Sequence, residues 1–185
     1  MTERSWKARV FIATSLDGFI ARPDGSIDWL TDRLPQSGHA PGDPDLPEDH
    51  GYATHMATVD HIVMGRGTYE KVLTFGGWPY SDHRAIVISS VLQTADERIT
   101  VARSIESVVS ILHERGSKGV YVDGGQTIQT FLRHGLIDEL VVTRIPVLIG
   151  HGLPLFGPLS RDVQLIHEGT VSTSGGFVQS RYRVR

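Results

Sequence analysis

Short apolar runs alternate with helix-like patterns through the middle of the chain. The apolar runs are rich in β-branched residues and cover residues 61–64, 84–90, 99–103 and 119–122. After two of these runs, apolar residues recur at helical spacing, and Ser104 and Gly116 are placed to cap and to end one such helix. This alternation predicts parallel strands joined by helical crossovers. A denser apolar run at residues 8–15 predicts a strand buried on both faces.

The pattern changes after Leu136. Residues 137–148 read as a strand that enters a Gly- and Pro-rich stretch. Residues 163–171 and 177–184 then alternate with period two around a Ser-Gly-Gly turn, which predicts a C-terminal antiparallel β-hairpin. The expected sheet is therefore mixed. With 185 residues, we expect one domain that spans residues 1–185.

Two segments between the predicted strands contain no long regular pattern. Residues 18–30 mix turn formers with apolar residues, which suits either a loop over a ligand or an ordinary surface loop with Trp29 in the core. Residues 31–51 are rich in Pro, Gly and Asp and predict a long loop, for which a lid, a partner contact and disorder are all compatible readings. Pro47 and two following acids predict a helix that runs to roughly Thr58.

Two strand-to-helix turns carry glycine and are the main candidates for ligand binding. Gly124 and Gly125 follow the run at 119–122, and Arg66 stands between two glycines after the run at 61–64. Glycine lets a ligand approach the backbone, and a helix N-terminus attracts an anion such as phosphate. Arg66 adds a bidentate donor. Each turn by itself is also compatible with a plain tight turn, since the spaced G-x-G-x-x-G fingerprint is absent.

Further polar groups follow other predicted strands. Ser89 and Ser90 end one strand, and Arg103 stands where another meets its helix. Ligands of open parallel sheets bind at the carboxyl ends of the strands, so these side chains and the two glycine turns are expected at one edge.

Composition excludes several classes of function. The formal net charge is -3 and no basic block occurs, which argues against a dedicated nucleic-acid binder. No cysteine is present, so disulfides and thiolate chemistry are excluded. The sequence contains neither a signal-peptide pattern nor a membrane-length apolar run, and we expect a cytoplasmic protein that does not bind membranes. The histidines lack a helical ligand pattern, so no metal site is expected.

Four stretches, in this order, resemble one known family: residues 13–21, 64–69, 88–90 and 122–125. They are similar to the dihydrofolate reductase fold and, within it, to the reductase domain of the riboflavin-biosynthesis deaminase-reductase proteins. The resemblance covers nearly the whole chain. It implies an α/β fold of three layers, α/β/α, around a mixed, mostly parallel sheet, and it implies NADPH as cofactor and a homodimer.

The resemblance also implies a role for individual residues. Ala13 and Ile20 would contact the nicotinamide, and Arg66 and Arg103 would bind the adenosine-side phosphates. Two arginines favour NADPH over NADH, because an acid there would repel the 2′-phosphate. The implied cofactor-binding set is Ala13, Ile20, Gly65, Arg66, Thr68, Ser89, Ser90, Arg103, Gly124, Gly125, Gln126 and Thr127.

The substrate side matches the family less closely. Dihydrofolate reductases carry a buried acid in the helix after a Trp that corresponds to Trp29; the matching position here is Leu34, and the nearest acid is Asp32. By resemblance to the riboflavin-pathway reductases, Asp17 is the predicted catalytic acid, although an Asp-Gly pair also suits a turn-capping role. The predicted substrate-binding residues are Asp28, Trp29, Asp32 and Thr143.

The leading hypothesis from the sequence is an NADPH-dependent reductase most similar to 5-amino-6-(5-phosphoribosylamino)uracil reductase, which transfers hydride to an imine-like carbon. The alternative within the enzyme class is a reductase of dihydrofolate or of another small pteridine or carbonyl substrate. A regulatory module that binds NADP(H) without turnover and a protein that uses only the scaffold are the non-enzyme alternatives.

Overall fold

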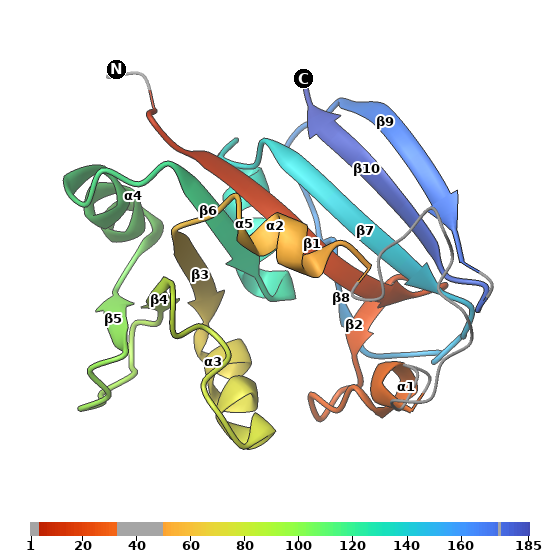
Figure 1. The fold of residues 1–185 in the computed structure, drawn as a ribbon, viewed down its shortest axis with the longest axis horizontal. Coiled ribbons are helices and arrows are strands. Elements are labelled where there is room, and N and C mark those ends of the chain that lie inside the picture. Colours follow the sequence, from red (N-terminus) through yellow and green to blue (C-terminus); the bar gives the residue numbers. More distant parts are fainter. Residues whose placement is uncertain (1–3, 33–49, 174) are drawn as a thin grey trace.

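An eight-stranded mixed sheet runs through the centre of the protein (Figure 1). The structure is a computed structural model and describes residues 4–32, 50–173 and 175–185. The strand order is β5-β4-β3-β6-β1-β7-β10-β9, and β10 runs antiparallel to both of its neighbours. The strands are β1 Lys7–Ser15, β3 His61–Gly65, β4 Arg84–Ile88, β5 Ile99–Ala102, β6 Gly119–Asp123, β7 Glu139–Ile145, β9 Leu165–Ser172 and β10 Val178–Val184. The predicted mixed, mostly parallel sheet and C-terminal hairpin are confirmed.

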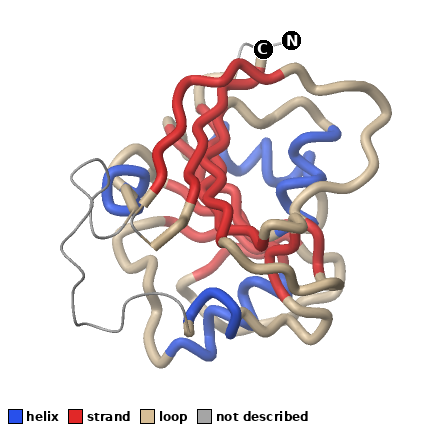
Figure 2. The backbone as a smooth tube through the Cα atoms, turned by 90° about the vertical axis from the view of Figure 1, so that its right-hand side faces the viewer, coloured by secondary structure: helices blue, strands red, loops and turns tan. Residues whose placement is uncertain are grey.

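Helices cover both faces of the sheet, so the three-layer prediction is also confirmed (Figure 2). The helices are α1 Asp28–Thr31, α2 Tyr52–Met56, α3 Arg66–Val72, α4 Ile105–Glu114 and α5 Gly125–Arg133, with a 3-10 turn at Leu73–Phe75. One apolar cluster joins α4 and α5 to one face through Val63 and Val122. A second cluster joins α3 to the opposite face through Ile62 and Tyr121. Alternate residues of β3 and β6 thus enter different cores, as the two-residue period requires.

The segment that the sequence predicted as one loop, residues 18–30, contains the short strand β2 and most of the short helix α1, which carries the buried Trp29. β2 (Phe19–Ala21) pairs with β8 (Leu153–Pro154) in a second, two-stranded sheet. These strands are too short to show a sequence period, and each forms only because a distant segment pairs with it.

The helix predicted to run to Thr58 is present as α2, Tyr52–Met56. Its predicted start at Pro47 and most of the predicted loop at 31–51 lie outside the described residues. Within the part of the chain that the structure describes, no helix combines the length and the apolar character needed to cross a membrane.

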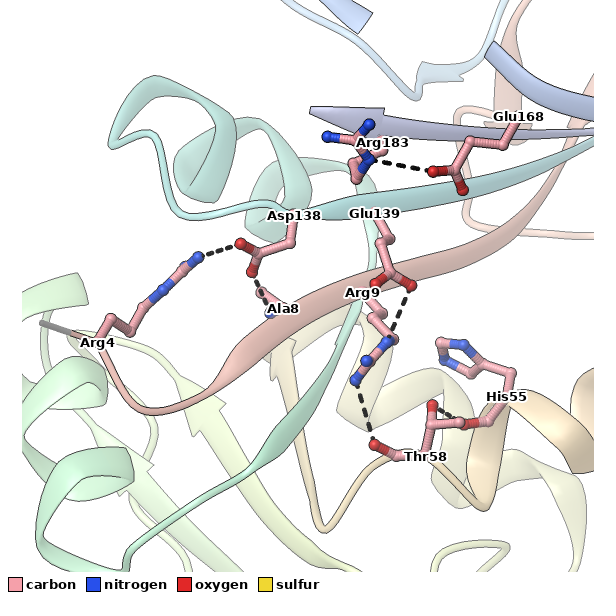
Figure 3. A network of polar contacts seen from close by, with 9 residues as sticks. All are labelled: Arg4, Ala8, Arg9, His55, Thr58, Asp138, Glu139, Glu168 and Arg183. Atoms are coloured by element: carbon pink, nitrogen blue, oxygen red, sulfur yellow. Dashed lines mark hydrogen bonds and ion pairs between the residues drawn. The ribbon is translucent and has the colours of Figure 1, made fainter. Parts of the chain in front are cut away.

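A polar network attaches the end of α2 to the sheet (Figure 3). Arg9 on β1 forms an ion pair with Glu139 on β7 at 3.0 Å, and its Nη1 donates to the carbonyl of Thr58 at 3.2 Å. The Thr58 hydroxyl in turn donates to the carbonyl of His55 at 2.7 Å. This end of α2 is therefore held beside β1 and β7 near the amino ends of these strands, at the edge of the sheet opposite the glycine turns.

Candidate functional site

The two glycine turns that the sequence singled out lie side by side. β3 pairs with β6 in parallel, so α3 and α5 start at adjacent strand ends. Their residues interlock: a Cβ atom added to Gly65 would lie 3.1 Å from the Thr127 hydroxyl, and one added to Gly124 would lie 2.2 Å from the Thr68 hydroxyl. The structure thus brings Gly65, Thr68, Gly124 and Thr127 together at one edge.

The Gly124-Gly125 pair is required by its surroundings. Gly124 has φ +87°, which L side chains rarely adopt, and Thr68 leaves no room for a side chain. A Cβ on Gly125 would lie 2.8 Å from the carbonyl oxygen of Pro154 and 3.0 Å from Cδ1 of Ile20. Ile20 therefore packs directly on the start of α5. The first-turn N–H groups of α5 have no acceptor within their own helix, so they can donate to a ligand beside this glycine pair.

Positively charged groups flank the glycine turns. Arg66 is exposed, and its only ion pair within the described residues is with Glu70 at 3.7 Å. Arg103 follows β5 at the same edge of the sheet, and its Nη1 donates to the carbonyls of Ser89 and Leu92 at 3.0 and 2.8 Å. Arg103 thus orders the loop after β4, and its side chain is exposed.

The two serines differ in their availability. The Ser89 hydroxyl accepts from the backbone N–H groups of Val91 and Leu92, at 3.3 and 3.0 Å. It therefore shapes its own loop. Ser90 and Gln126, by contrast, are exposed.

An acid that the sequence analysis did not select stands at the centre of this edge. Asp123 ends β6 and is half-buried, with Oδ1 accepting the Gly124 N–H at 2.8 Å. Burial raises the pKa of Asp123 to about 6, and the hydrogen bonds from Gly124 and Tyr121 offset only part of that effect. Burial raises the pKa values of Tyr52 and Tyr80, and the negative charge of the nearby Asp123 raises them further. A carboxyl group with a raised pKa therefore lies directly beside the glycine turns.

Asp17, the acid selected from the sequence, has a different environment. Its carboxylate is exposed and accepts the backbone N–H groups of Ile149 and Gly150, the latter at 2.8 Å. A hydrogen bond from Ser15, followed by these backbone bonds, lowers the pKa of Asp17. The geometry favours an anchor for the segment after β7, and a catalytic role for Asp17 stays a prediction.

The predicted substrate residues separate into two groups. Trp29 packs with Ile145 and Phe177 in a small buried cluster. Thr143 is also buried; it lies two residues before Ile145 on β7 and pairs with Ala13 of β1. The acids of α1 point elsewhere: Asp28 is half-buried, and its hydrogen bond from Arg22, at 2.7 Å, lowers its pKa.

Asp32 is exposed at the end of α1. Leu34, the position of the folate-type acid, lies outside the described residues.

Comparisons with known proteins bear on this site. The model of the RibD C-terminal domain matches residues 7–178. The chain belongs to the RibD C-terminal domain family. The uncharacterized protein YwjB of Bacillus subtilis is 35% identical over 181 residues, which are 95% of this chain and 97% of that protein. A protein of Shewanella sp. PV-4 assigned to riboflavin biosynthesis has a solved structure with TM-score 0.82 and 35% identity, covering 97% of this chain and 99% of the other.

The fold extends beyond the RibD C-terminal domain family. Dihydrofolate reductase from Enterococcus faecalis, solved in complex with NADP(H), superimposes with TM-score 0.67 and 18% identity over 98% of each chain. At that identity the likeness establishes the dihydrofolate reductase-like fold alone. The resemblance inferred from the four sequence stretches is confirmed.

Two residues of the site were not selected from the sequence. Asp123 directly follows a buried strand and precedes a glycine pair, which is the position where ligands of parallel sheets bind, so its place was a usable signal. Gln179 is buried on β10, and only the pairing of β10 with β7 puts it beside Thr143. No local sequence pattern identifies such a neighbour.

Proposed function

We propose that the protein is an NADPH-dependent reductase. The observation that carries the proposal is the contact between two glycine turns at one sheet edge, flanked by Arg66 and Arg103. Close-packed glycines, the N–H groups at the start of α5 and two arginines suit a dinucleotide with an additional phosphate. Membership in the RibD C-terminal domain family supports an oxidoreductase.

The residues at this edge fit such a cofactor. The pyrophosphate would be held at the start of α5 by Gly124, Gly125, Gln126 and Thr127. At the start of α3, Gly65 and Thr68 would hold it from the other side. Ala13 and Ile20 would border the nicotinamide, while Arg66, Ser90 and Arg103 would bind the 2′-phosphate. The bound cofactor supplies a hydride donor, and the protein contributes orientation and charge.

Reduction of an imine-like carbon also needs a proton at the neighbouring nitrogen. We assign this proton to Asp123, because an acid with a pKa of about 6 is partly protonated at neutral pH and can return to its anionic form after transfer. Asp17 is a weaker candidate for the same step, since its lowered pKa keeps it ionised at neutral pH.

The substrate that we propose is a phosphoribosylaminopyrimidine of the riboflavin pathway, 5-amino-6-(5-phosphoribosylamino)uracil. Support comes from the family and from α1, where Asp28 is engaged by Arg22 at 2.7 Å and Asp32 is exposed. A dihydropteridine needs an acidic partner there, so dihydrofolate is the second substrate to test.

The test is titration of the purified protein with NADPH, followed by nicotinamide fluorescence, with NADH in parallel. We expect selective NADPH binding that weakens by roughly tenfold or more in Arg66→Ala, as expected for a lost charge-assisted contact. Arg161→Ala is the matched control, because Arg161 is an exposed arginine between β8 and β9. Loss of NADPH absorbance on adding the aminopyrimidine phosphate, but not dihydrofolate, then identifies the reaction.

Other outcomes each lead to a different function. Oxidation by dihydrofolate alone would favour the pteridine alternative. Tight binding without oxidation by any substrate would favour a regulatory NADP(H)-binding module, and absence of NADPH binding would refute the cofactor assignment.

We further propose a cytoplasmic homodimer. Its support is the family resemblance together with β9, an eight-residue strand at the edge of the sheet. An unpaired strand edge presents N–H and C=O groups to a second chain. Light scattering of the purified protein should give twice the mass of one chain, and a monomer at all concentrations would contradict this proposal.

A further inference from the structure

A cavity open to solvent lies at the amino ends of β4 and β5, and it has a volume of about 380 Å³. Arg84 is the first residue of β4, and Ile99 is the first residue of β5. The glycine turns follow the carboxyl ends of β3 and β6, which run parallel to β4 and β5. This β4–β5 cavity is therefore at the edge of the sheet opposite the proposed cofactor site. Its polar lining consists of His83, Arg84, Glu97, Arg98, Thr100 and Arg115.

The lining of the β4–β5 cavity has an excess of positive charge. Arg84, Arg98 and Arg115 are exposed, and Glu97 is the one acid beside them in the lining. In residues 4–32, 50–173 and 175–185, neither Arg84 nor Arg115 forms an ion pair, and Glu97 forms none either. Guanidinium groups around one cavity repel one another unless an anion lies between them, so this lining suits a negatively charged ligand.

Two of the three arginines are held in a fixed orientation. Nη2 of Arg115, at the end of α4, donates to the Thr100 hydroxyl at 2.8 Å. Nε and Nη2 of Arg98 donate to the two carboxylate oxygens of Asp96, each at 2.7 Å, and its guanidinium lies 4.8 Å from the centre of the Trp78 ring. Arg98 keeps Nη1 for a further acceptor. Because these side chains are already ordered, an anion that binds them removes less conformational freedom.

A phosphate group has the chemistry that this lining recognises. The planar guanidinium pairs with phosphate oxygens through two parallel hydrogen bonds. The Thr100 hydroxyl accepts from Arg115, so its own hydrogen can be donated to a phosphate oxygen. The volume of the cavity is in the range of small-molecule sites and leaves room for more than one phosphate group. Ala85 and Ile99 in the lining offer contacts for carbon atoms of the ligand.

We propose that the β4–β5 cavity binds a small organic phosphate through the guanidinium groups of Arg84, Arg98 and Arg115. Glu97 lines the same cavity and opposes the anion, so it limits the affinity. The site shares no residue with the glycine turns. Its occupancy therefore does not depend on the reductase assignment.

The experiment measures binding of glycerol 3-phosphate to the purified protein by titration calorimetry, with glycerol as the uncharged control. Saturating NADP+ is present in one series, so that the phosphate cannot enter the proposed cofactor site. We expect glycerol 3-phosphate to bind in both series and glycerol to bind in neither.

Variants of the lining locate the bound phosphate. Arg84→Ala and Arg115→Ala should each weaken the binding by about tenfold, as expected for a lost charge-assisted contact. Thr100→Val keeps the shape of the side chain but frees Arg115, and it should weaken the binding by about threefold. Glu97→Gln removes the opposing charge and should strengthen the binding by about threefold. A gain of this kind cannot result from damage to the fold.

Arg144→Ala is the matched control, because Arg144 is an exposed arginine on β7 and does not line the cavity. It removes the same charge from the protein and should leave glycerol 3-phosphate affinity within about twofold of the parent value.

Two results would overturn the inference. If the parent protein binds no glycerol 3-phosphate, the arginines serve only to keep the edge strand β5 from pairing with other chains. If the parent binds it but Arg84→Ala and Arg115→Ala bind it equally well, the phosphate lies elsewhere. Failure of the proposed function looks different, since NADPH binding would then be absent while the series without NADP+ still reports on the β4–β5 cavity.

Discussion

Asp123 illustrates how burial at one residue sets its chemistry. Its carboxyl group ends a strand whose other side chains are buried, and a single backbone N–H, from Gly124, donates to it at 2.8 Å. Desolvation outweighs that hydrogen bond and the one from Tyr121, so the charged form is disfavoured. Among the groups that affect the pKa of Asp123 in the described chain, none is positively charged.

We predict that Asp123→Asn stabilises the protein while it reduces activity. The folded-state pKa of about 6 lies above the ordinary 3.8, so ionisation of Asp123 costs stability as pH rises from 4 to 6, and the cost persists above that range. Near neutral pH the variant should gain about 1 to 3 kcal/mol in urea unfolding. The gain should disappear below about pH 4.

Activity should fall at least about a hundredfold if Asp123 supplies the proton. Gln126→Asn, at a neighbouring exposed position, serves as a control for the unfolding measurements alone. Equal unfolding free energies of the parent and Asp123→Asn at all pH values would contradict the raised pKa.

At the scale of elements, the contact between the start of α3 and the start of α5 is the feature on which the site depends. We predict that Gly124→Ala destabilises the protein by about 2 kcal/mol or more, because φ is +87° and the new Cβ would lie 2.2 Å from the Thr68 hydroxyl. Urea unfolding measures the change, and NADPH affinity should fall in parallel.

Matched variants separate the causes of that loss. Adding Thr68→Ala should recover part of the stability by removing the clash, while the strain of a positive φ remains. Gly67→Ala has open space around the new methyl group and should be neutral or slightly stabilising in α3. A loss in Gly67→Ala as large as that in Gly124→Ala would show that helix substitution, not the interlock, is responsible.

The segment between β7 and β8 gives a second prediction at this scale. Asp17→Ala removes the acceptor for the N–H groups of Ile149 and Gly150, so the melting temperature should fall and KM should rise by about threefold. The pH profile of kcat/KM should keep its shape, because the pKa of Asp17 is lowered and its charge does not change near neutral pH. Loss of the limb at higher pH, where an essential acid deprotonates, would instead make Asp17 the catalytic acid.

For the molecule as a whole, the attachment of α2 to the sheet makes stability depend on pH. His55 is buried on α2, where its ring contacts the rings of Phe11 and Tyr121, and it lies next to the Arg9–Glu139 pair (Figure 3). Burial, followed by the positive charge of Arg9, lowers the pKa of His55 from 6.5 to about 4, whereas the charge of Glu139 opposes this shift. Arg181 and His83 act in the same direction as Arg9.

The sign of the effect follows from the lowered pKa. Between pH 6.5 and pH 4 the unfolded chain binds a proton at His55 and the folded chain does not, so stability falls as pH decreases through this window. The contribution is about 3 kcal/mol over the window. Urea unfolding of the parent and of His55→Gln should therefore diverge in slope against pH, with the smaller acid-induced loss in the variant. Parallel curves would contradict the burial of a neutral His55.

The sequence determined the layers of this molecule. The buried runs at β3, β4 and β6, the periodic helices α4 and α5, and the alternating hairpin β9–β10 each carry a local signal, because apolar spacing directly reflects which face is buried. The glycine turns were predictable for the same local reason. The strands β2 and β8 could not be predicted, since a strand of two or three residues exists only through its partner. The four-residue helix α1 is too short to show a helical period.

Chemistry at the site was decided by the tertiary structure. The sequence contains both Asp17 and Asp123 beside glycine. Only the fold surrounds Asp17 with hydrogen-bond donors from Ser15, Ile149 and Gly150, and only the fold buries Asp123. Gln179 and Thr143 are separated by 36 residues and meet because β10 pairs with β7. Spacing along a chain reports which face a residue occupies, whereas its pKa and its hydrogen-bonding partners depend on segments that only the fold brings near.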